Sequence, residues 1–327
     1  MTDRTLSPVR LEDMAWEDTT FAVPCYSSRD LLLESLGRNG ILHPPWVWDE
    51  PGGKYVIVDG FTRLRWARES GAESLPCTVF GRRTPRERLV CLRIEEKLLG
   101  SPLNPAEKAR LVALLGEISP VEKDFPRLLS ALGISGRREI VEAWRRLDSA
   151  GAELLEAAAS GGICERAALE LARWDPGSAR EVLGWFRVLR CSASIQVEVL
   201  DRIGEIAARE KREKLDLLKD PAWGSILGSS HWNHREKTRE LRNLLARRRF
   251  PRLHARMDRF RRDLAGLSLP ESLQLVPPRD FEGDRWELRL GFSTESDLAR
   301  GAKAAQGLAE SGKLDEVLHP DRFAGSP

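Results

Sequence analysis

The chain has 327 residues, of which 41% are hydrophobic and 31% are charged, and its formal net charge is +2. This length accommodates two or three domains, and this composition excludes a fully disordered chain. A net charge so close to zero identifies no partner by itself.

Cysteine usage and hydropathy indicate the cellular compartment of the protein. The five cysteines are odd in number and widely spaced, and none forms a C-x-x-C pair. Neither a disulfide framework nor a zinc site is therefore expected, and we predict no metal-ligating residues. The first ten residues lack an apolar signal core, and no apolar run reaches membrane-spanning length. We expect a cytoplasmic protein without a membrane partner, associated with the nucleoid if it binds DNA.

Residues 1–90 alternate short strand and helix signals and are predicted to form a small α/β domain. A helix over 30–37 ends in the turn that contains Gly40. The β-branched and aromatic run over 55–58 predicts a buried strand. The other expected elements are a strand over 46–48, a glycine hairpin over 49–54, a helix over 61–70 and a strand over 75–80.

Residues 91–219 show helical patterns throughout and are predicted to form a helical domain. Asn104 is expected to cap a helix, with Pro105 at the first helical position and Glu107 at the third. Further helices are expected over 122–132, 136–147, 152–159, 164–173, 179–189 and 194–210.

The last third of the chain predicts a linker and a small C-terminal domain. Residues 220–246 are expected to hold a Gly-, Ser- and Trp-rich linker, up to about 234, and the start of a basic helix. Residues 247–327 are expected to hold the rest of that helix, broken near Pro251, then strands over 272–276 and 285–292 and a helix over 296–311. The whole chain is therefore predicted to be α+β.

The turn Asp59-Gly60-Phe61-Thr62-Arg63 joins the predicted strand over 55–58 to a helix, which is a recurrent arrangement for binding phosphate. A helix N-terminus offers unpaired N–H groups and a positive dipole end. Gly60 allows a ligand to approach the backbone, Thr62 adds a hydroxyl, and Arg63 can bind phosphate in bidentate fashion. An ordinary surface turn is the alternative for this motif taken alone.

The motifs around this turn resemble the N-terminal domain of ParB-type partition proteins, which is itself similar to sulfiredoxin. The family pattern has a G-hydrophobic-hydrophobic-Q-P turn, then a hairpin, then a G-E-R-R segment. In this chain residues 40–44 correspond to the first turn and residues 60–63 to the G-E-R-R segment, in the same order. The segment Leu103-Asn104-Pro105-Ala106-Glu107 matches the family's L-N-P-x-E motif. Counting back from it places Glu96 at an acidic position and Lys97 at the amide position that follows.

The resemblance implies a pocket for cytidine triphosphate with magnesium, lined by Gly40, Gly60, Arg63 and the candidate catalytic Glu96. His43, Thr62 and Lys97 are further candidates for contacts with the nucleotide. This chain departs from the family at those three positions, where His43 replaces glutamine, Phe61-Thr62 replace an acidic-basic pair, and Lys97 replaces asparagine. The resemblance also implies DNA, a second copy of the chain and a partition ATPase as partners.

Residues 125–135 are spaced like a helix-turn-helix. The small Ala131 and the turn residue Gly133 precede a second helix, which Ser135 is expected to cap. Ile140, Val141 and Trp144 of that helix are expected to point inward. Proteins of the resembled family carry such an element directly after the L-N-P helix.

Arg137 and Arg138 lie in the first turn of the second helix and Arg145 lies further along, which predicts contacts with DNA. Glu139 and Glu142 on the same helix weaken a nucleic-acid face. Packing against protein therefore stays open as an alternative for this element.

The strongest electrostatic feature is the segment 235–262, which contains 12 Lys or Arg residues and 3 Asp or Glu residues. Within it, Arg247, Arg248, Arg249 and Arg252 are predicted to bind DNA phosphates without sequence preference and in a salt-dependent manner. The alternative is a solvated helix whose arginines pair with the acidic residues that follow.

Three functional hypotheses remain from the sequence. The first is a nucleotide-responsive, ParB-like DNA-binding protein in chromosome or plasmid partition or in transcriptional regulation. The second is a nucleotide hydrolase or phosphotransferase that acts through Glu96, with the slow triphosphatase activity of the resembled family as its mildest form. The third is an adaptor that has kept the fold and lost ligand binding.

Overall fold

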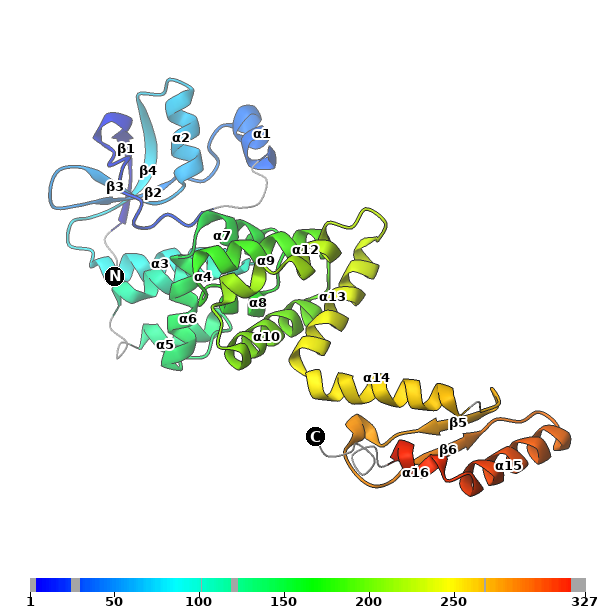
Figure 1. Cartoon of the computed structure of the whole chain (residues 1–327). Coiled ribbons are helices and arrows are strands. Elements are labelled where there is room, and N and C mark those ends of the chain that lie inside the picture. Colours follow the sequence, from blue (N-terminus) through cyan, green and yellow to red (C-terminus); the bar gives the residue numbers. More distant parts are fainter. Residues whose placement is uncertain (1–3, 25–29, 101, 119–122, 268, 319–327) are drawn as a thin grey trace. The chain divides into compact units, whose positions relative to one another are not determined.

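The computed structural model describes residues 4–24, 30–100, 102–118, 123–267 and 269–318. They divide into two compact units, Met1–Thr238 and Arg239–Pro327. The first unit holds a small mixed sheet and most of the helices, and the second holds a two-stranded sheet with helices (Figure 1). The chain is therefore α+β, as predicted.

The sheet of the first unit has the strand order β1-β4-β2-β3. Strand β4 is antiparallel to β1 and parallel to β2, and β2 is antiparallel to β3. Helix α2 contributes Leu64 to a core that also contains Val47, Ile57 and Cys77. The bounds are Arg4–Arg10 for β1, Leu11–Asp13 for η1, Asp30–Asn39 for α1, Trp46–Asp49 for β2, Tyr55–Asp59 for β3, Phe61–Glu69 for α2 and Ser74–Phe80 for β4.

Strand β1 was not assigned from the sequence. Its residues read RTLSPVR, and the internal Pro8 argues against a central strand. In the structure β1 is an edge strand, with Pro8 opposite Pro76 of β4. An edge position tolerates a residue without a backbone N–H, so only the tertiary pairing reveals this strand.

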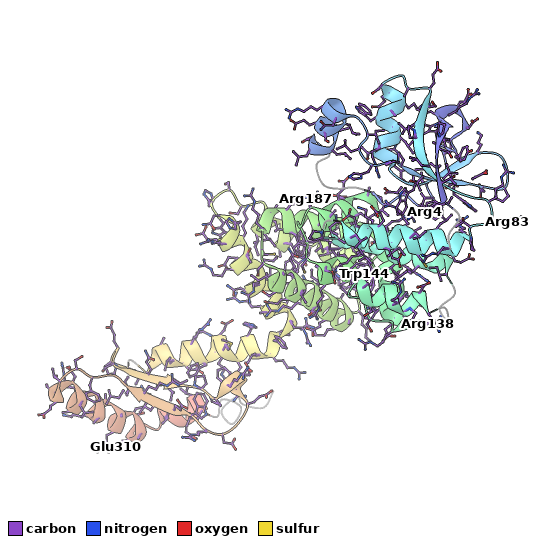
Figure 2. The ribbon with its side chains drawn as sticks, turned by 180° about the vertical axis from the view of Figure 1, so that it is seen from behind. Arg4, Arg83, Arg138, Trp144, Arg187 and Glu310 are labelled. Atoms are coloured by element: carbon purple, nitrogen blue, oxygen red, sulfur yellow. The ribbon has the colours of Figure 1, made fainter. Side chains whose placement is uncertain are left out.

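Helices follow from Arg86 onward, close to the predicted ranges. Asn104 caps α4 as predicted: its side chain accepts from the Glu107 backbone, and the Glu107 side chain accepts from the Asn104 backbone. Figure 2 shows Trp144 inside the bundle and Arg138 at its surface. The bounds are Arg86–Leu99 for α3, Pro105–Leu114 for α4, Leu115–Glu117 for η2, Asp124–Ala131 for α5, Arg138–Asp148 for α6, Ala152–Ala159 for α7, Glu165–Leu171 for α8, Pro176–Leu189 for α9, Ala193–Glu210 for α10, Lys214–Leu218 for α11 and Pro221–Leu227 for α12.

The segment predicted as a linker differs from that expectation. Helix α12 occupies much of it, and Trp223 of α12 is 1% exposed. The Trp223 ring lies 5.7 Å from the Trp185 ring, and its indole N–H donates to the Leu217 carbonyl at 2.7 Å. A glycine- and serine-rich composition suited a linker, but one buried tryptophan holds this segment in the first compact unit.

Helix α13 (His234–Arg249) crosses the boundary between the units, and α14 (Pro251–Gly266) follows after the expected break. Strands β5 (Leu273–Val276) and β6 (Glu287–Leu290) pair antiparallel, with the short η3 (Arg279–Phe281) between them. The second unit ends with α15 (Glu295–Glu310) and α16 (Lys313–Leu318). Leu290 of β6 packs so closely on Gly301 of α15 that a Cβ there would clash with it.

Within the described ranges, no helix combines the length and the apolar character that a membrane crossing needs.

Candidate functional site

The turn between β3 and α2 is built around Gly60. Gly60 has φ 88° and ψ 24°, in the left-handed region, and it is the N-cap of α2. A Cβ at this position would lie 2.8 Å from the Cβ of Pro45. Both the backbone conformation and the close approach of Pro45 therefore require glycine here. No side-chain hydrogen bond caps α2, and the unpaired first-turn N–H groups of a helix are donors that suit an anion.

Arg63, the predicted phosphate ligand, is already engaged. One guanidinium nitrogen donates to the His43 carbonyl, and another pairs with a carboxylate oxygen of Asp59 at 2.5 Å. The Arg63 side chain is 19% exposed. A phosphate would therefore bind Arg63 from its exposed side or displace one of these partners.

Asp59 carries a second arginine on its other oxygen. Arg93 of α3 pairs with Asp59 at 2.6 Å and donates to the Phe21 carbonyl at 3.2 Å. Burial lowers the pKa of Arg93 below its ordinary value, and the Asp59 carboxylate opposes that shift. One carboxylate between two guanidinium groups leaves a local charge of +1, which favours an anion nearby.

Arg93 and Asp59 are not among the site residues that the sequence predicts. The signal that indicates them is the position of Arg93 in an otherwise apolar stretch of α3, between buried Cys91 and Ile94. A charged side chain at a core-facing position requires a partner. An acidic residue at the end of β3, directly before the glycine turn, is a suitable one.

The other residues predicted for the nucleotide lie around this turn. His43 is exposed and contributes its carbonyl to Arg63. Gly40, with φ 67°, ends α1 by donating its N–H to the Leu36 carbonyl at 3.0 Å. Thr62 is half-buried in the first turn of α2. The structure thus joins His43, Gly60 and Arg63 by direct contacts and places Thr62 beside them in sequence.

Lys97 and Glu96 have different surroundings on α3. The Lys97 ammonium donates to Glu107 at 2.8 Å, and Glu107 is the 7% exposed residue of the α4 capping box. Lys97 therefore ties the end of α3 to the start of α4. Glu96 is exposed, makes no hydrogen bond or ion pair to another described residue, and interacts electrostatically with Arg93.

The helix-turn-helix spacing corresponds to α5 and α6, with Gly133 at φ 72° between them. Val141 and Trp144 are buried as expected. The prediction that Ser135 caps α6 is wrong, because Arg137 is the N-cap and the Ser135 hydroxyl accepts from the Arg137 N–H at 3.4 Å. The chain stays extended for two residues longer than the spacing indicated.

The arginines at the start of α6 face carboxylates of the same helix. Arg138 pairs with Glu142 at 2.8 Å, and Arg137 lies 3.7 Å from Glu139. The Arg138 contact lowers the pKa of Glu142 below its usual value. Arg145 lies at the exposed C-terminal part of α6. Exposed pairs of this kind contribute little free energy, so DNA phosphates can compete for Arg137 and Arg138.

The basic cluster lies where α13 ends and α14 begins. Arg247 and Arg252 are exposed, and Arg248 and Arg249 are half-buried. Arg249 lies over the Phe250 ring, 4.8 Å from its centroid. The four arginines therefore form one short basic stretch around the interhelical break. Among the described residues, no group of three or more His, Cys, Asp or Glu side chains is placed to hold a metal ion.

No family profile and no curated protein matches the chain. Among solved structures it is similar to C-terminally truncated chromosome-partitioning protein ParB from Caulobacter crescentus in two complexes. One, with CTP-gamma-S, is 22% identical over 55% of this chain and 99% of that chain, with a TM-score of 0.26. The other, with the centromeric parS site, is 21% identical over 60% of this chain and 99% of that chain, with a TM-score of 0.33.

A Pnob8-like ParB-N domain is also similar, at 18% identity over 76% of this chain and 99% of that chain, with a TM-score of 0.37. At these identities and TM-scores, the ligands of the three structures do not transfer to this chain. Conclusions about its ligands rest on its own residues.

Proposed function

We propose that this chain is a ParB-like DNA-binding protein that responds to a nucleotide and acts in partition or in transcriptional regulation. The order of its motifs supports the proposal: a glycine turn before α2, a capped L-N-P helix, and a helix-turn-helix spacing in α5 and α6. The single observation that carries DNA binding is the basic segment 235–262, with 12 basic and 3 acidic residues. Such an excess neutralises phosphates whatever the base sequence.

The nucleotide part of the proposal rests on the charge and geometry of the turn at Gly60. The uncapped first turn of α2, the guanidinium of Arg63 and the +1 charge of the Arg63-Asp59-Arg93 cluster all suit a triphosphate. Magnesium bound with the nucleotide would offset part of the phosphate charge. Glu96 is the exposed carboxylate of α3 beside this cluster, and it would take part in holding that ion or in hydrolysis.

The DNA-binding test replaces Arg247, Arg248 and Arg249 together by alanine in the full chain. Fluorescence anisotropy with duplex DNA over a series of salt concentrations measures the dependence of log K on log salt. We expect the magnitude of the slope to fall by about 3, because each lost phosphate contact removes roughly 0.9.

The matched control for this test removes the same charge elsewhere, at the exposed residues Arg4, Arg65 and Arg83. Equal losses in both triple variants would refute the assignment, since the effect would then follow net charge alone. A double Arg137→Ala, Arg138→Ala variant tests α6 separately: loss of sequence preference with an unchanged salt slope would assign base readout to it.

The nucleotide test compares Arg63→Ala with Arg65→Ala, since Arg65 is an exposed neighbour on the same helix. Thermal shift with each of the four nucleoside triphosphates and magnesium measures binding. We expect a shift, largest with CTP, that Arg63→Ala abolishes and Arg65→Ala retains. Phosphate release that disappears in Glu96→Gln would assign hydrolysis to Glu96, and no shift with any triphosphate would refute nucleotide binding.

A second candidate is an adaptor that has lost its ligands. The engaged cations favour it, because Arg63 is held by Asp59 and His43, and Lys97 is held by Glu107. A protein that binds neither duplex DNA nor any triphosphate in the two assays above would support this candidate.

A further inference from the structure

A groove runs along helix α7, apart from the turn at Gly60 and from the first turn of α6. Two hollows of about 470 and 420 Å³ form it. Leu183 of α9 lines both of them. The first hollow takes Glu153 and Leu154 from the start of α7, and the second takes Ala157 and Ser160 from its end. The groove is therefore about as long as α7, or roughly 12 Å at 1.5 Å per residue.

The floor of the groove is apolar. Leu154, Leu171 and Leu183 lie beneath the first hollow, and Ile163 and Phe186 lie beneath the second. Two polar side chains of the first hollow already have partners: Ser149 donates to the Arg145 carbonyl at 3.2 Å, and the Trp174 indole donates to Glu170 at 3.0 Å. A small-molecule site would instead aim several polar groups inward, so the floor suits apolar side chains.

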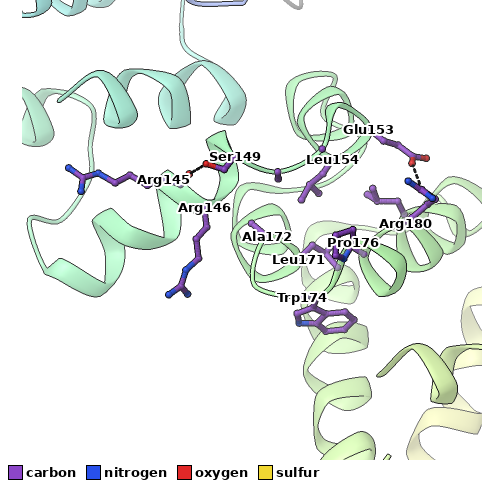
Figure 3. Close-up of a pocket in the computed structure, with 14 residues that line it drawn as sticks. Arg145, Arg146, Ser149, Glu153, Leu154, Leu171, Ala172, Trp174, Pro176 and Arg180 are labelled. Atoms are coloured by element: carbon purple, nitrogen blue, oxygen red, sulfur yellow. Dashed lines mark hydrogen bonds and ion pairs between the residues drawn. The ribbon is translucent and has the colours of Figure 1, made fainter. Parts of the chain in front are cut away.

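The rim of the groove is positive at the end formed by the first hollow. Glu153 is the one carboxylate among the residues that line this hollow, and Arg180 and Arg187 neutralise it at 3.3 and 2.9 Å. Arg146 is exposed, makes no hydrogen bond or ion pair with a described residue, and interacts electrostatically with the Glu142 carboxylate, whose pKa it helps to lower. Figure 3 shows Glu153 beside Arg180 on one side of the hollow and Arg146 on the other, with Arg145 directed away. The exposed Glu156 marks the opposite end.

We propose that this groove binds an amphipathic helix of a partner protein, with leucine-like side chains on the floor and carboxylates next to Arg146 and Arg180. An apolar trough between helices with charged flanks is the arrangement that receives such helices. The charge complementarity at the Arg146 end sets the orientation of the bound helix. Duplex DNA has no apolar side chains to fill the floor. The proposal is independent of nucleotide and DNA binding.

The test uses the full chain and three labelled synthetic helical peptides of equal length. The first carries leucines on one face and flanking glutamates, the second replaces the glutamates with lysines, and the third replaces the leucines with serines. Fluorescence anisotropy measures their binding. We expect the leucine-glutamate peptide to bind at least about tenfold more tightly than the other two.

Two variants test whether the peptide binds in the groove. Arg146→Glu is expected to weaken the leucine-glutamate peptide by about tenfold and to favour the lysine peptide. Ala157→Trp fills the second hollow from a half-buried position and is expected to weaken both leucine peptides. Arg83→Glu, which makes the same change of charge at an exposed residue between β4 and α3, is the control and is expected to change neither affinity.

Equal binding of all three peptides, binding of none, or loss of binding in Arg83→Glu as large as in Arg146→Glu would each overturn the proposal. Displacement of the peptide by duplex DNA would assign the groove to the nucleic-acid interface instead. Self-association that Arg146→Glu abolishes, measured by sedimentation equilibrium, would assign it to a second copy of the chain.

Discussion

Replacing Gly60 by alanine adds a single heavy atom, the Cβ, to the turn between β3 and α2. Gly60 has φ 88°, and an added Cβ would lie 2.8 Å from the Cβ and 3.1 Å from the Cα of Pro45. Pro45 cannot move aside easily, because it is buried and its carbonyl accepts from the Thr78 N–H of β4 at 2.8 Å. The new methyl group therefore meets a fixed part of the sheet.

Two contributions set the size of the effect. The left-handed conformation costs an L-residue about 1–2 kcal/mol, and forcing an extra methyl into a packed site costs about 1–3 kcal/mol. We therefore expect Gly60→Ala to lower the free energy of unfolding by about 2–5 kcal/mol. Gly71→Ala is the matched control, because Gly71 has φ 78° and its added Cβ would meet nothing within 4 Å. It should show the conformational contribution alone.

Amide hydrogen exchange on peptides that span β3 and α2 measures the local free energy of opening in each variant. The expected result is faster exchange in Gly60→Ala than in Gly71→Ala. Equal exchange in the two variants would refute the reasoning, since the contact with Pro45 would then contribute nothing. Binding of a triphosphate, measured on the same proteins, should fall in Gly60→Ala alone.

Asp59→Asn leaves Arg93 buried without its counter-ion and is expected to lower the free energy of unfolding by about 3–5 kcal/mol, measured by thermal unfolding. Glu142→Gln breaks an exposed pair and should leave that free energy nearly unchanged, so similar losses in the two variants would contradict the difference in burial. Burial raises the pKa of Cys77 from 9.0 to about 11, so its neutral thiol contributes stability below pH 9 that is lost as the pH rises through 11. That loss is worth about 3 kcal/mol, and the unfolding free energy of Cys77→Ala, followed between these pH values, should lack it. An unchanged pH dependence would exclude Cys77 as the titrating group. Trp223→Ala is expected to destabilise the first unit by about 3–5 kcal/mol in urea unfolding, while a cost near zero would return residues 220–234 to the status of a linker.

Local physics explains what the sequence alone determined. A glycine between a β-branched run and a helix predicts a strand-to-helix turn, and Gly60 lies between β3 and α2 as the N-cap of α2. Asn104, Pro105 and Glu107 predict a capped helix start, and α4 begins there with both capping bonds. Each of these features depends on residues within four positions of one another, so the interactions that stabilise them are readable in order along the chain.

Tertiary structure decided which charged side chains form ion pairs or hydrogen bonds between elements, and which segments are buried. The contacts of Arg63 with His43, of Arg93 with Asp59 and of Lys97 with Glu107 join separate elements, and their spacing in sequence does not reveal them. Burial of Trp223 likewise depends on α9, which presents Trp185 to it. The sequence thus identified the turn at Gly60 and the basic segment. Only the folded chain shows that Arg63 also holds the His43 carbonyl and that Asp59 also holds the buried Arg93, because these contacts depend on neighbours in space.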